Sequence, residues 1–253
     1  QILEKRKTTS AGTEFNNYAY DDYGNRIQTA RTYVDGYCEL QLYEYDVFNR
    51  LTFDNWFGSY TYNGDNIRQT ITDFAGNITY DIYDGGNLVA RKQGTNTHAY
   101  IYGLEQEFYI SGYDFGIYST NHRGDISKEI HLNSGNEKTR AYSAYGTSIA
   151  SAYSNISPFG YAGEVRDNSG LTYLRNRYYD EETGTFMTMD PIKDGLNWYS
   201  YCAGNPVMYV DPLGLKLKLR GTPNEVQAIM NNIKKLSHDE LTLIQDKVDL
   251  GNG

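Results

Sequence analysis

A tyrosine-rich motif recurs along the first hundred residues, and it constrains the fold more than any other feature of the sequence. Each copy holds two closely spaced tyrosines, then Asp or Asn, then a turn-forming Gly or Asn. The copies occupy 18–27, 43–51, 60–68 and 80–88, with a shorter one at 100–103. Their second tyrosines are 25, 17 and 21 positions apart, so the period is loose, at about twenty residues.

The motif has the physical character of a β-hairpin. In Tyr-x-Tyr both rings lie on one face of a strand, because side chains alternate between the two faces. Asp, Asn and Gly then supply Asx turns and positive φ angles, so packing and turn formation are the expected roles of Tyr20, Tyr45 and Asp46. A single hairpin is marginal in water, so the units should stack edge to edge. We therefore predict an all-β fold, a curled antiparallel sheet that buries the rings of Tyr20, Tyr45 and Tyr62 on one face.

The composition agrees with a folded β protein and excludes several other classes. Tyrosine accounts for 26 of the 253 residues, which offsets a hydrophobic content of only 39%, because each ring buries apolar area. Disordered chains are poor in aromatic residues. No uncharged apolar run approaches the ~18 residues that a membrane-spanning helix needs. The net charge of −9 argues against a nucleic-acid surface, which requires clustered Lys and Arg.

The sequence lacks the common motifs for metals, cofactors and hydrolases. The four histidines are scattered, at 98, 122, 131 and 238, and no HExxH, GxGxxG, GxxxxGK[ST] or GxSxG motif occurs. Cys38 and Cys202 lie 164 positions apart without a CxxC spacing, so we expect two unpaired thiols. We therefore expect no cofactor and no metal.

From position 158 to 215 the chain carries a second, denser set of motifs. They are GEVRD at 163–167, RYYD at 177–180, GTF at 184–186, DPI at 190–192 and DPLGL at 211–215. Together with the tyrosine repeats, this series resembles the Rhs/YD-repeat family, which includes bacterial Rhs polymorphic toxins, the C components of insecticidal toxin complexes and the teneurins. The resemblance covers about 15–215, and 158–215 matches the Rhs-repeat-associated core. It implies a β-strand spiral that closes into a hollow shell.

The resemblance also implies a catalytic site. The Rhs core is identified as an aspartic autoprotease that cuts after a DPxGL signature, which makes Asp190 and Asp211 the dyad and Leu215–Lys216 the cleaved bond. Two carboxylates close together in a low-dielectric pocket hold one proton between them. Such a pair suits amide hydrolysis, because one carboxylate activates water while the other protonates the leaving group. Arg177 matches the family's supporting arginine, and would orient a carboxylate or polarise the scissile carbonyl.

Other interpretations of these residues stay open. Asp-Pro is also an ordinary turn opener, so both segments could be plain turns in a structural or adhesive β-shell. Arg175 lies two positions from Arg177, and on the same face if the strand is straight, although we favour Arg177. Asp167, Asp180 and Asp194 are expected in turns or at the surface. A carbohydrate-binding surface is a weaker alternative, because exposed Tyr with Asp and Asn suits sugars.

The sequence changes character after Leu215. Residues 216–220 predict a short basic and apolar strand, and residues 222–249 contain two capping boxes that predict short helices. We therefore expect a YD-repeat shell fragment at 1–157, the self-cleaving core at 158–215 and the helical start of a variable toxin region at 216–253.

The predicted function is a toxin shell that encloses a C-terminal toxin and releases it by one self-cleavage. The implied partners are the chain's own toxin region, a cognate immunity protein and a delivery machinery, without nucleic acid or a membrane span. The chain begins at Gln1 and shows no signal peptide, so we expect a piece of a longer protein. A secreted or cell-surface location is implied by the family resemblance alone.

Overall fold

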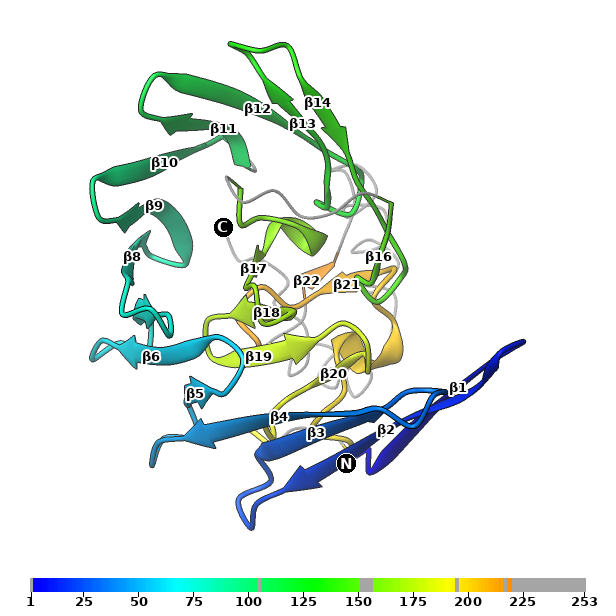
Figure 1. Cartoon of the computed structure of the whole chain (residues 1–253). Coiled ribbons are helices and arrows are strands. Elements are labelled where there is room, and N and C mark those ends of the chain that lie inside the picture. Colours follow the sequence, from blue (N-terminus) through cyan, green and yellow to red (C-terminus); the bar gives the residue numbers. More distant parts are fainter. Residues whose placement is uncertain (1, 104–105, 151–156, 194–195, 216–217, 220–253) are drawn as a thin grey trace, which may run out of the picture.

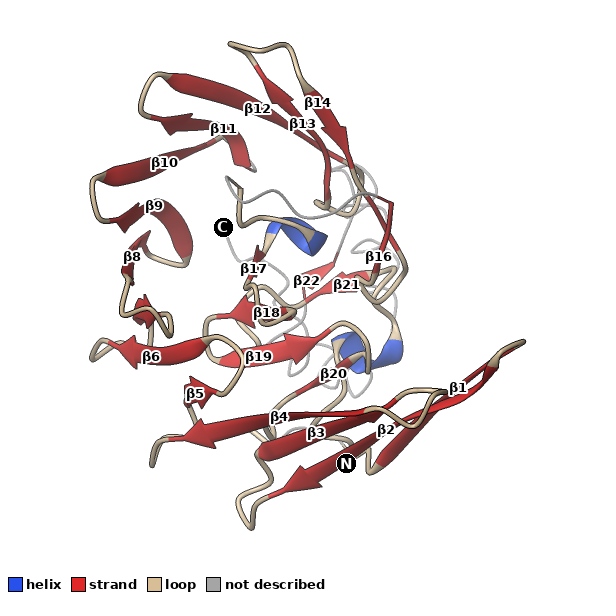
Figure 2. Ribbon diagram, viewed as in Figure 1, coloured by secondary structure: helices blue, strands red, loops and turns tan. Residues whose placement is uncertain are grey.

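The computed structural model describes residues 2–103, 106–150, 157–193, 196–215 and 218–219, and these form an almost purely β structure (Figure 1). A 14-stranded sheet runs from β1 to β14 in the order of the chain, and its neighbouring strands are antiparallel. The sheet curls into an arc, and the described residues between 157 and 215 fill its concave side (Figure 1). Two short 3₁₀ helices are the helical elements of the described residues (Figure 2).

The large sheet covers the tyrosine repeats and the strands that follow them. Its strands are β1 (Glu4–Thr9), β2 (Gly12–Tyr20), β3 (Arg26–Thr32), β4 (Cys38–Tyr45), β5 (Leu51–Asp54), β6 (Gly58–Tyr62), β7 (Arg68–Thr72), β8 (Ile78–Asp84), β9 (Asn87–Gln93), β10 (Asn96–Tyr102), β11 (Gln106–Ser111), β12 (Asp114–Thr120), β13 (Ile126–His131) and β14 (Glu137–Thr139).

Smaller elements follow β14 in the chain. They are β15 (Ala141–Tyr142), β16 (Ser148–Ala150), η1 (Tyr161–Gly163), β17 (Val165–Arg166), β18 (Leu171–Leu174), β19 (Arg177–Asp180), β20 (Thr185–Phe186), η2 (Cys202–Gly204), β21 (Tyr209–Val210) and β22 (Lys218–Leu219). β17 to β20 form a four-stranded sheet, whereas β15–β16 and β21–β22 are two-stranded pairs.

An aspartate side chain stabilises the turn in each of the first two repeats. The Oδ1 atoms of Asp21 and Asp46 accept hydrogen bonds from backbone N–H groups two and four residues later, at 2.8–3.0 Å. The fourth residue of the turn then has a positive φ, 81° at Gly24 and 61° at Asn49. Gly and Asn adopt this left-handed conformation more readily than other residues. The Asp-x-x-Gly/Asn pattern therefore forms the predicted Asx turns.

The repeat tyrosines line the concave face of the sheet. In the second and third repeats the first tyrosine is the more buried, since Tyr43 and Tyr60 are 5% and 4% exposed, whereas Tyr80 of the fourth repeat is 49% exposed. The second tyrosines, Tyr45 and Tyr62, are half-buried and pack against the same cluster. The Tyr62 hydroxyl donates to the Leu51 carbonyl oxygen at 2.7 Å, so one repeat is joined to the one before it. The Tyr62 ring thus contributes buried apolar area while its hydroxyl keeps a polar partner.

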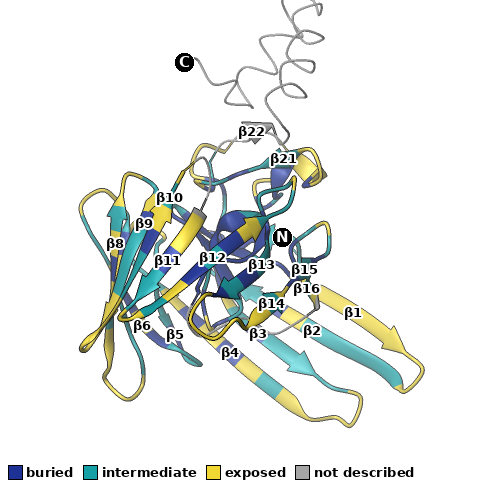
Figure 3. Ribbon diagram, turned by 90° about the horizontal axis from the view of Figure 1, so that it is seen from above, coloured by how far each residue is buried: buried dark blue, intermediate teal, exposed yellow. Residues whose placement is uncertain are grey.

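Residues 158–215 meet this tyrosine face with rings of their own. Tyr60 packs on Tyr178 with ring centroids 5.8 Å apart, and Tyr100 meets Phe159 edge-on at 4.9 Å. Aromatic pairs in these arrangements stabilise a core beyond their buried area. Buried residues gather where the two parts meet, whereas β1 is exposed along its whole length (Figure 3).

The structure confirms the predicted all-β, curled antiparallel sheet for the described residues. Tyr20 also faces inward, half-buried, with its ring centroid 5.6 Å from that of Tyr199. The sheet is an arc rather than a closed shell, because no pairing joins β1 to β14 among the described strands. The helices predicted at 222–249 lie outside the described residues. The described part of the strand predicted at 216–220 is β22, which pairs with β21.

Candidate functional site

The DPLGL segment, 211–215, is bound by three consecutive side chains, two in the turn after β18 and one at the start of β19. The carbonyl oxygens of Pro212, Leu213 and Gly214 accept hydrogen bonds from Arg175, Asn176 and Arg177, in that order. The first two distances are 3.1 Å from Arg175 Nη1 and 2.9 Å from Asn176 Nδ2. One side chain per carbonyl fixes both the direction and the register of the segment.

Two of these side chains come from a two-residue hairpin turn, and Arg177 directly follows it in β19. Leu174 pairs with Arg177 across β18 and β19, so Arg175 and Asn176 are the turn residues. Arg175 has a φ of 58°, in the left-handed region. Gly214 has a φ of 67°, and a Cβ there would lie 3.0 Å from the Leu174 carbonyl oxygen. The close approach of the two backbones therefore requires glycine at position 214.

Arg177 is the buried cation of the site, with 5% of its surface exposed. Its Nε donates to the Gly214 carbonyl, its Nη1 donates to the Trp198 carbonyl at 3.2 Å, and its Nη2 lies 3.7 Å from Asp211 Oδ2. Burial lowers the pKa of the Arg177 guanidinium, whereas the charges of Asp190 and Asp211 oppose that change. Both predicted carboxylates therefore act on the same arginine.

The two predicted aspartates are themselves buried, Asp190 with 8% and Asp211 with 2% exposed. Asp211 Oδ1 accepts a hydrogen bond from the Leu215 N–H at 2.9 Å, which brings this carboxylate to the residue before the predicted cleavage point. Asp190 Oδ1 accepts from the N–H two residues later at 3.0 Å, and its own N–H donates to the Trp198 carbonyl at 2.9 Å. That carbonyl also accepts from Arg177, so it links the Asp190 loop to the arginine.

The described residues after Leu215, which form β22, are fixed by strand pairing. Tyr209 of β21 pairs with Leu219 of β22, so the DPLGL segment lies in the loop of a hairpin. Lys216, the predicted residue after the cleaved bond, lies outside the described residues. The described backbone on both sides of this bond is therefore fixed, by Arg175, Asn176 and Arg177 before it and by strand pairing after it.

Sequence reasoning does not identify Asn176, and it places Arg175 only as an alternative to Arg177. The assumption of a straight strand is wrong at this point, because Arg175 is in the turn and not in β19. Both arginines bind the segment, through different carbonyls. The available signal was the Arg-Asn pair itself, since Asn favours turns.

Asp167 and Asp180, expected in turns or at the surface, begin turns and also form buried ion pairs. Asp167 binds Arg68 of β7, and Asp180 Oδ2 accepts from Arg26 Nη1 at 2.5 Å. Two arginines of the tyrosine repeats therefore attach the sheet to the later residues. Asp194 lies outside the described residues.

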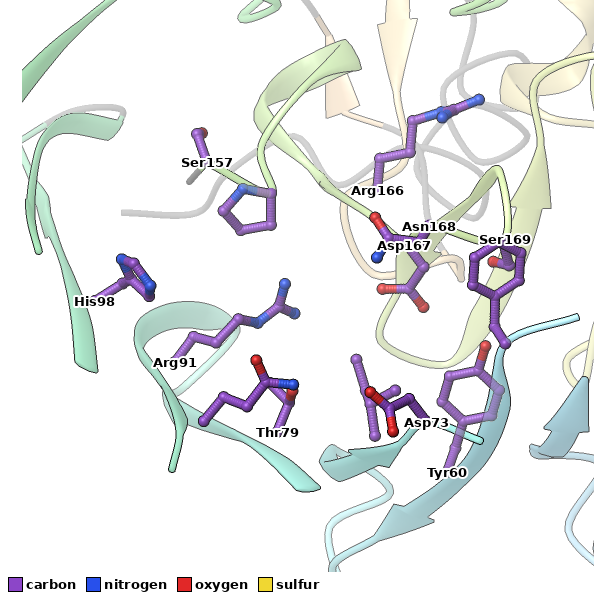
Figure 4. A pocket seen from close by; sticks show the side chains of 14 residues that line it. Tyr60, Asp73, Thr79, Arg91, His98, Ser157, Arg166, Asp167, Asn168 and Ser169 are labelled. Atoms are coloured by element: carbon purple, nitrogen blue, oxygen red, sulfur yellow. The ribbon is translucent and has the colours of Figure 1, made fainter. Parts of the chain in front are cut away.

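A polar cavity of about 480 Å³ lies between the sheet and the 157–169 segment (Figure 4). Arg91 and His98 line it from the sheet, and Arg166 and Asp167 from the opposite side. Tyr60 Oη and Asp167 Oδ1 have no hydrogen-bond partner among the described residues. Water ordinarily satisfies buried polar groups in a roomy cavity of this kind. Neither predicted aspartate lines the cavity, so it is separate from the cluster around Arg177.

The described residues contain neither a metal-binding cluster nor a membrane-spanning helix. No three His, Cys, Asp or Glu side chains within the described ranges are grouped so that they could hold a metal ion. In the same part of the chain, no helix has the length and apolar character needed to cross a membrane. Cys38 is exposed and Cys202 is buried, and no disulfide links them.

Comparison with known proteins relates the chain to parts of much longer proteins. No family model matches it. The tRNA3(Ser)-specific nuclease WapA of Bacillus spizizenii is 28% identical over 256 residues, in an alignment that covers 78% of this chain and 11% of WapA. The double-stranded DNA deaminase toxin A of Burkholderia cenocepacia is 42% identical over 74 residues, covering 28% of this chain and 5% of the toxin.

A solved structure shows the same fold. The crystal structure of TcdB2-TccC3 without its hypervariable C-terminal region matches 80% of this chain and 13% of that chain, with a TM-score of 0.57 and 18% identity. The chain spans about a tenth of the length of the WapA relative. It is therefore similar to a small part of each of these proteins, and shares with the TcdB2-TccC3 structure the architecture of its sheet.

Proposed function

We propose that this chain belongs to the Rhs/YD-repeat toxins and cuts itself once, after Leu215, to release a C-terminal toxin from a β-shell. In this proposal 1–157 is shell, 158–215 is the self-cleaving core, and 216–253 begins the released region. The observation that carries the proposal is the held DPLGL segment, whose carbonyls are bound one by one beside the buried Asp190, Asp211 and Arg177.

The proposed reaction is hydrolysis of the Leu215–Lys216 amide. One aspartate, ionised, takes a proton from water, and the water oxygen forms the new bond to the Leu215 carbonyl carbon. The other aspartate, protonated, gives its proton to the departing Lys216 nitrogen as the C–N bond breaks. The two protonation states are restored in sum, so no cofactor is required.

The substrate and the catalyst belong to one chain, which explains why no open binding cleft is needed. A held peptide has a high effective molarity toward the groups beside it. Arg177 would stabilise the negative charge that develops on the carbonyl oxygen, because a buried cation acts strongly in a water-poor site. Its hydrogen bond to the Gly214 carbonyl keeps it within one residue of the reacting bond.

A non-enzymatic β-shell is the alternative, and one observation favours it. Asp190 Oδ1 accepts the backbone N–H two residues later, and Asp211 Oδ1 accepts the one four residues later, as ordinary turn residues do. In that case the two Asp-Pro segments shape loops and have no chemical role.

Replacing each aspartate by asparagine separates the two functions. Asn keeps an Oδ1 acceptor for the turn hydrogen bond, but it cannot exchange a proton as a carboxyl group does. Asp190→Asn and Asp211→Asn should each leave the chain folded and intact, whereas the unsubstituted chain yields a fragment that begins at Lys216. The measurement is intact mass with N-terminal sequencing of the products.

Asp35→Asn is the matched control, since Asp35 Oδ1 also accepts a backbone N–H two residues later, at 3.0 Å, in an exposed turn. This variant should cut normally. A double variant of Asp190 and Asp211 that still yields the Lys216 fragment would reject the proposed chemistry. An unsubstituted chain that stays whole would favour the structural shell.

The relatives support the toxin part of the proposal, since two of them are named as a nuclease and a deaminase toxin. The released toxin, its immunity protein, a delivery complex and an extracellular or cell-surface location follow as further parts of the same proposal. The shell would be completed by chain beyond the arc seen here, because the relatives are much longer than this sequence.

A further inference from the structure

We propose that Arg175 is a positioning residue of this self-cleavage. It aligns the DPLGL segment only when the β8–β9 hairpin of the large sheet has packed against residues 158–215, called the core below. The inference rests on the proposed function. It adds a residue and a condition, because cleavage would depend on the folded state of the sheet as well as on the aspartates.

Arg175 contacts three separate parts of the molecule at once. Its Nη1 donates to the Pro212 carbonyl at 3.1 Å, within the segment to be cut. Its Nε donates to the Gly86 carbonyl at 2.7 Å, in the turn between β8 and β9. The same guanidinium forms an ion pair with Glu164, in the core. One side chain therefore joins sheet, core and substrate segment.

The backbone of Arg175 indicates that this side chain is needed at this position. Its φ of 58° lies in the left-handed region, which is unfavourable for a residue with a Cβ. Gly or Asn would form the turn with less strain. Strain at a residue with several specific contacts points to a functional constraint rather than to the turn alone.

The chemistry of the contacts requires arginine. Arg175 is 8% exposed, and burial lowers the pKa of its guanidinium. Glu164, 7% exposed, supplies the opposite charge. A planar guanidinium can donate in several fixed directions, to a carboxylate and to two carbonyls, whereas a lysine ammonium lacks this geometry.

The contact with Gly86 ties the segment to the sheet. Gly86 lies 89 positions before Arg175 in the chain, so the hydrogen bond forms only after the sheet has curled around the core. Leu213 is close as well, since a Cβ on Gly86 would lie 3.5 Å from its Cδ2. The β8–β9 turn thus touches both Arg175 and the segment that Arg175 holds.

The test removes the guanidinium without leaving a buried lone charge. Arg175→Asn combined with Glu164→Gln suits the left-handed turn and neutralises the partner, which avoids the cost of an unpaired buried carboxylate. Cleavage is followed as a first-order time course after cell-free synthesis, with protease resistance of the same samples as the measure of folding. We expect cleavage slowed by on the order of tenfold to a hundredfold at unchanged protease resistance, because small misplacements of a reacting group have effects of this size.

Two further variants separate positioning from general packing. Arg175→Lys keeps the positive charge but lacks the planar guanidinium with its several donor directions, and should cleave at an intermediate rate. Arg166→Gln with Glu181→Gln removes another core ion pair, of 3.1 Å, and should leave the rate close to that of the unsubstituted chain. An equal loss in the control and test pairs would mean that any damage to the core slows cleavage, and would overturn the inference.

The dependence on the sheet is tested at Gly86. A leucine there would press on Leu213 and Arg175, so Gly86→Leu should slow cleavage. Gly64→Leu is the control, because a Cβ at Gly64 meets nothing within 4 Å and its φ is not left-handed. Equal rates for the two variants would reject the coupling to the sheet.

Failure of the inference about Arg175 can be distinguished from failure of the proposed function. If the asparagine variants of Asp190 and Asp211 abolish cleavage while the Arg175 and Glu164 double variant cuts at the normal rate, the function stands and the inference fails. If the aspartate variants still cut, the proposed function fails, whatever Arg175 does.

Discussion

Two buried arginines of the large sheet form the ion pairs that attach it to residues 158–215. Arg26 and Arg68 are each 1% exposed or less, and they bind Asp180 and Asp167 across the interface. Arg68 Nη1 also donates to the Tyr178 hydroxyl at 2.7 Å. The repeat pattern predicts an arginine at the start of a returning strand, but not its burial. Charged residues in strands are usually solvated, and of the two carboxylates that pair with Arg68, that of Asp167 lies 99 positions away in the chain.

Replacing Arg68 by methionine should destabilise the protein strongly. Met fills much of the space but leaves Asp167 as a buried carboxylate without its arginine, which costs about 3–5 kcal/mol. Arg50→Met is the control, because the Arg50–Asp46 pair is partly exposed, at 20% and 22% for the two side chains, and such pairs contribute about 0–1 kcal/mol. The free energy of unfolding, measured by urea denaturation, should fall much further for Arg68→Met. Similar losses in the two variants would contradict this account.

At the scale of single elements, the hairpin turns were the most predictable part of the fold. Asp73 repeats the device of Asp21, since its Oδ1 accepts the N–H groups of residues 75 and 77 at 2.9 Å, and Gly76 then has a φ of 81°. Such turns depend on contacts within five residues, so the sequence contains all the information they need. The register of β18 and β19 was less predictable, because the short Arg175-Asn176 turn lacks the glycine that marks many hairpins.

Gly76 should therefore tolerate alanine poorly. A Cβ there meets no atom within 4 Å, so the whole cost of Gly76→Ala is the left-handed backbone, about 1 kcal/mol or more. Gly64 lies in an equally open turn without a left-handed φ, and Gly64→Ala should be neutral or slightly stabilising. Thermal unfolding of the two variants measures the difference. A lower melting temperature for Gly64→Ala than for Gly76→Ala would contradict the assignment of strain.

The whole molecule depends on covering the concave face of the sheet. That face carries the rings of Tyr43, Tyr60, Tyr100 and Tyr118, and the rings of the core cover it. A fragment of residues 1–140 would expose these rings to water, and a sheet without a second layer has no closed core.

We expect the 1–140 fragment to lose cooperative unfolding and to bind the dye ANS, whereas residues 1–215 should unfold cooperatively. Near-UV circular dichroism of the tyrosines and ANS fluorescence during urea titration provide the measurements. A sharp transition in the short fragment at the urea concentration of the longer one would show that the sheet is stable alone.

The sequence predicted the fold at this scale better than it predicted the candidate site. The repeats require an extended sheet, and a sheet with tyrosine rings on one face needs a second layer to cover that face. The site depends on contacts between distant parts of the chain, such as Arg175 with Gly86 and Arg177 with Trp198. A motif names Asp190, Asp211 and Arg177 as candidates, but no local pattern indicates that three consecutive side chains bind three consecutive carbonyls.

The order of strands in the large sheet follows the order of the chain, and this has a consequence for how such proteins can vary. A whole hairpin can be inserted or deleted at a turn while the other strands keep their order and their alternating directions, because every connection joins adjacent strands. The unequal spacing of 25, 17 and 21 residues shows that hairpins of different lengths already coexist in one sheet. Adding hairpins lengthens the arc while each inward face stays inward, so the enclosed capacity can grow or shrink by whole repeats without a new fold.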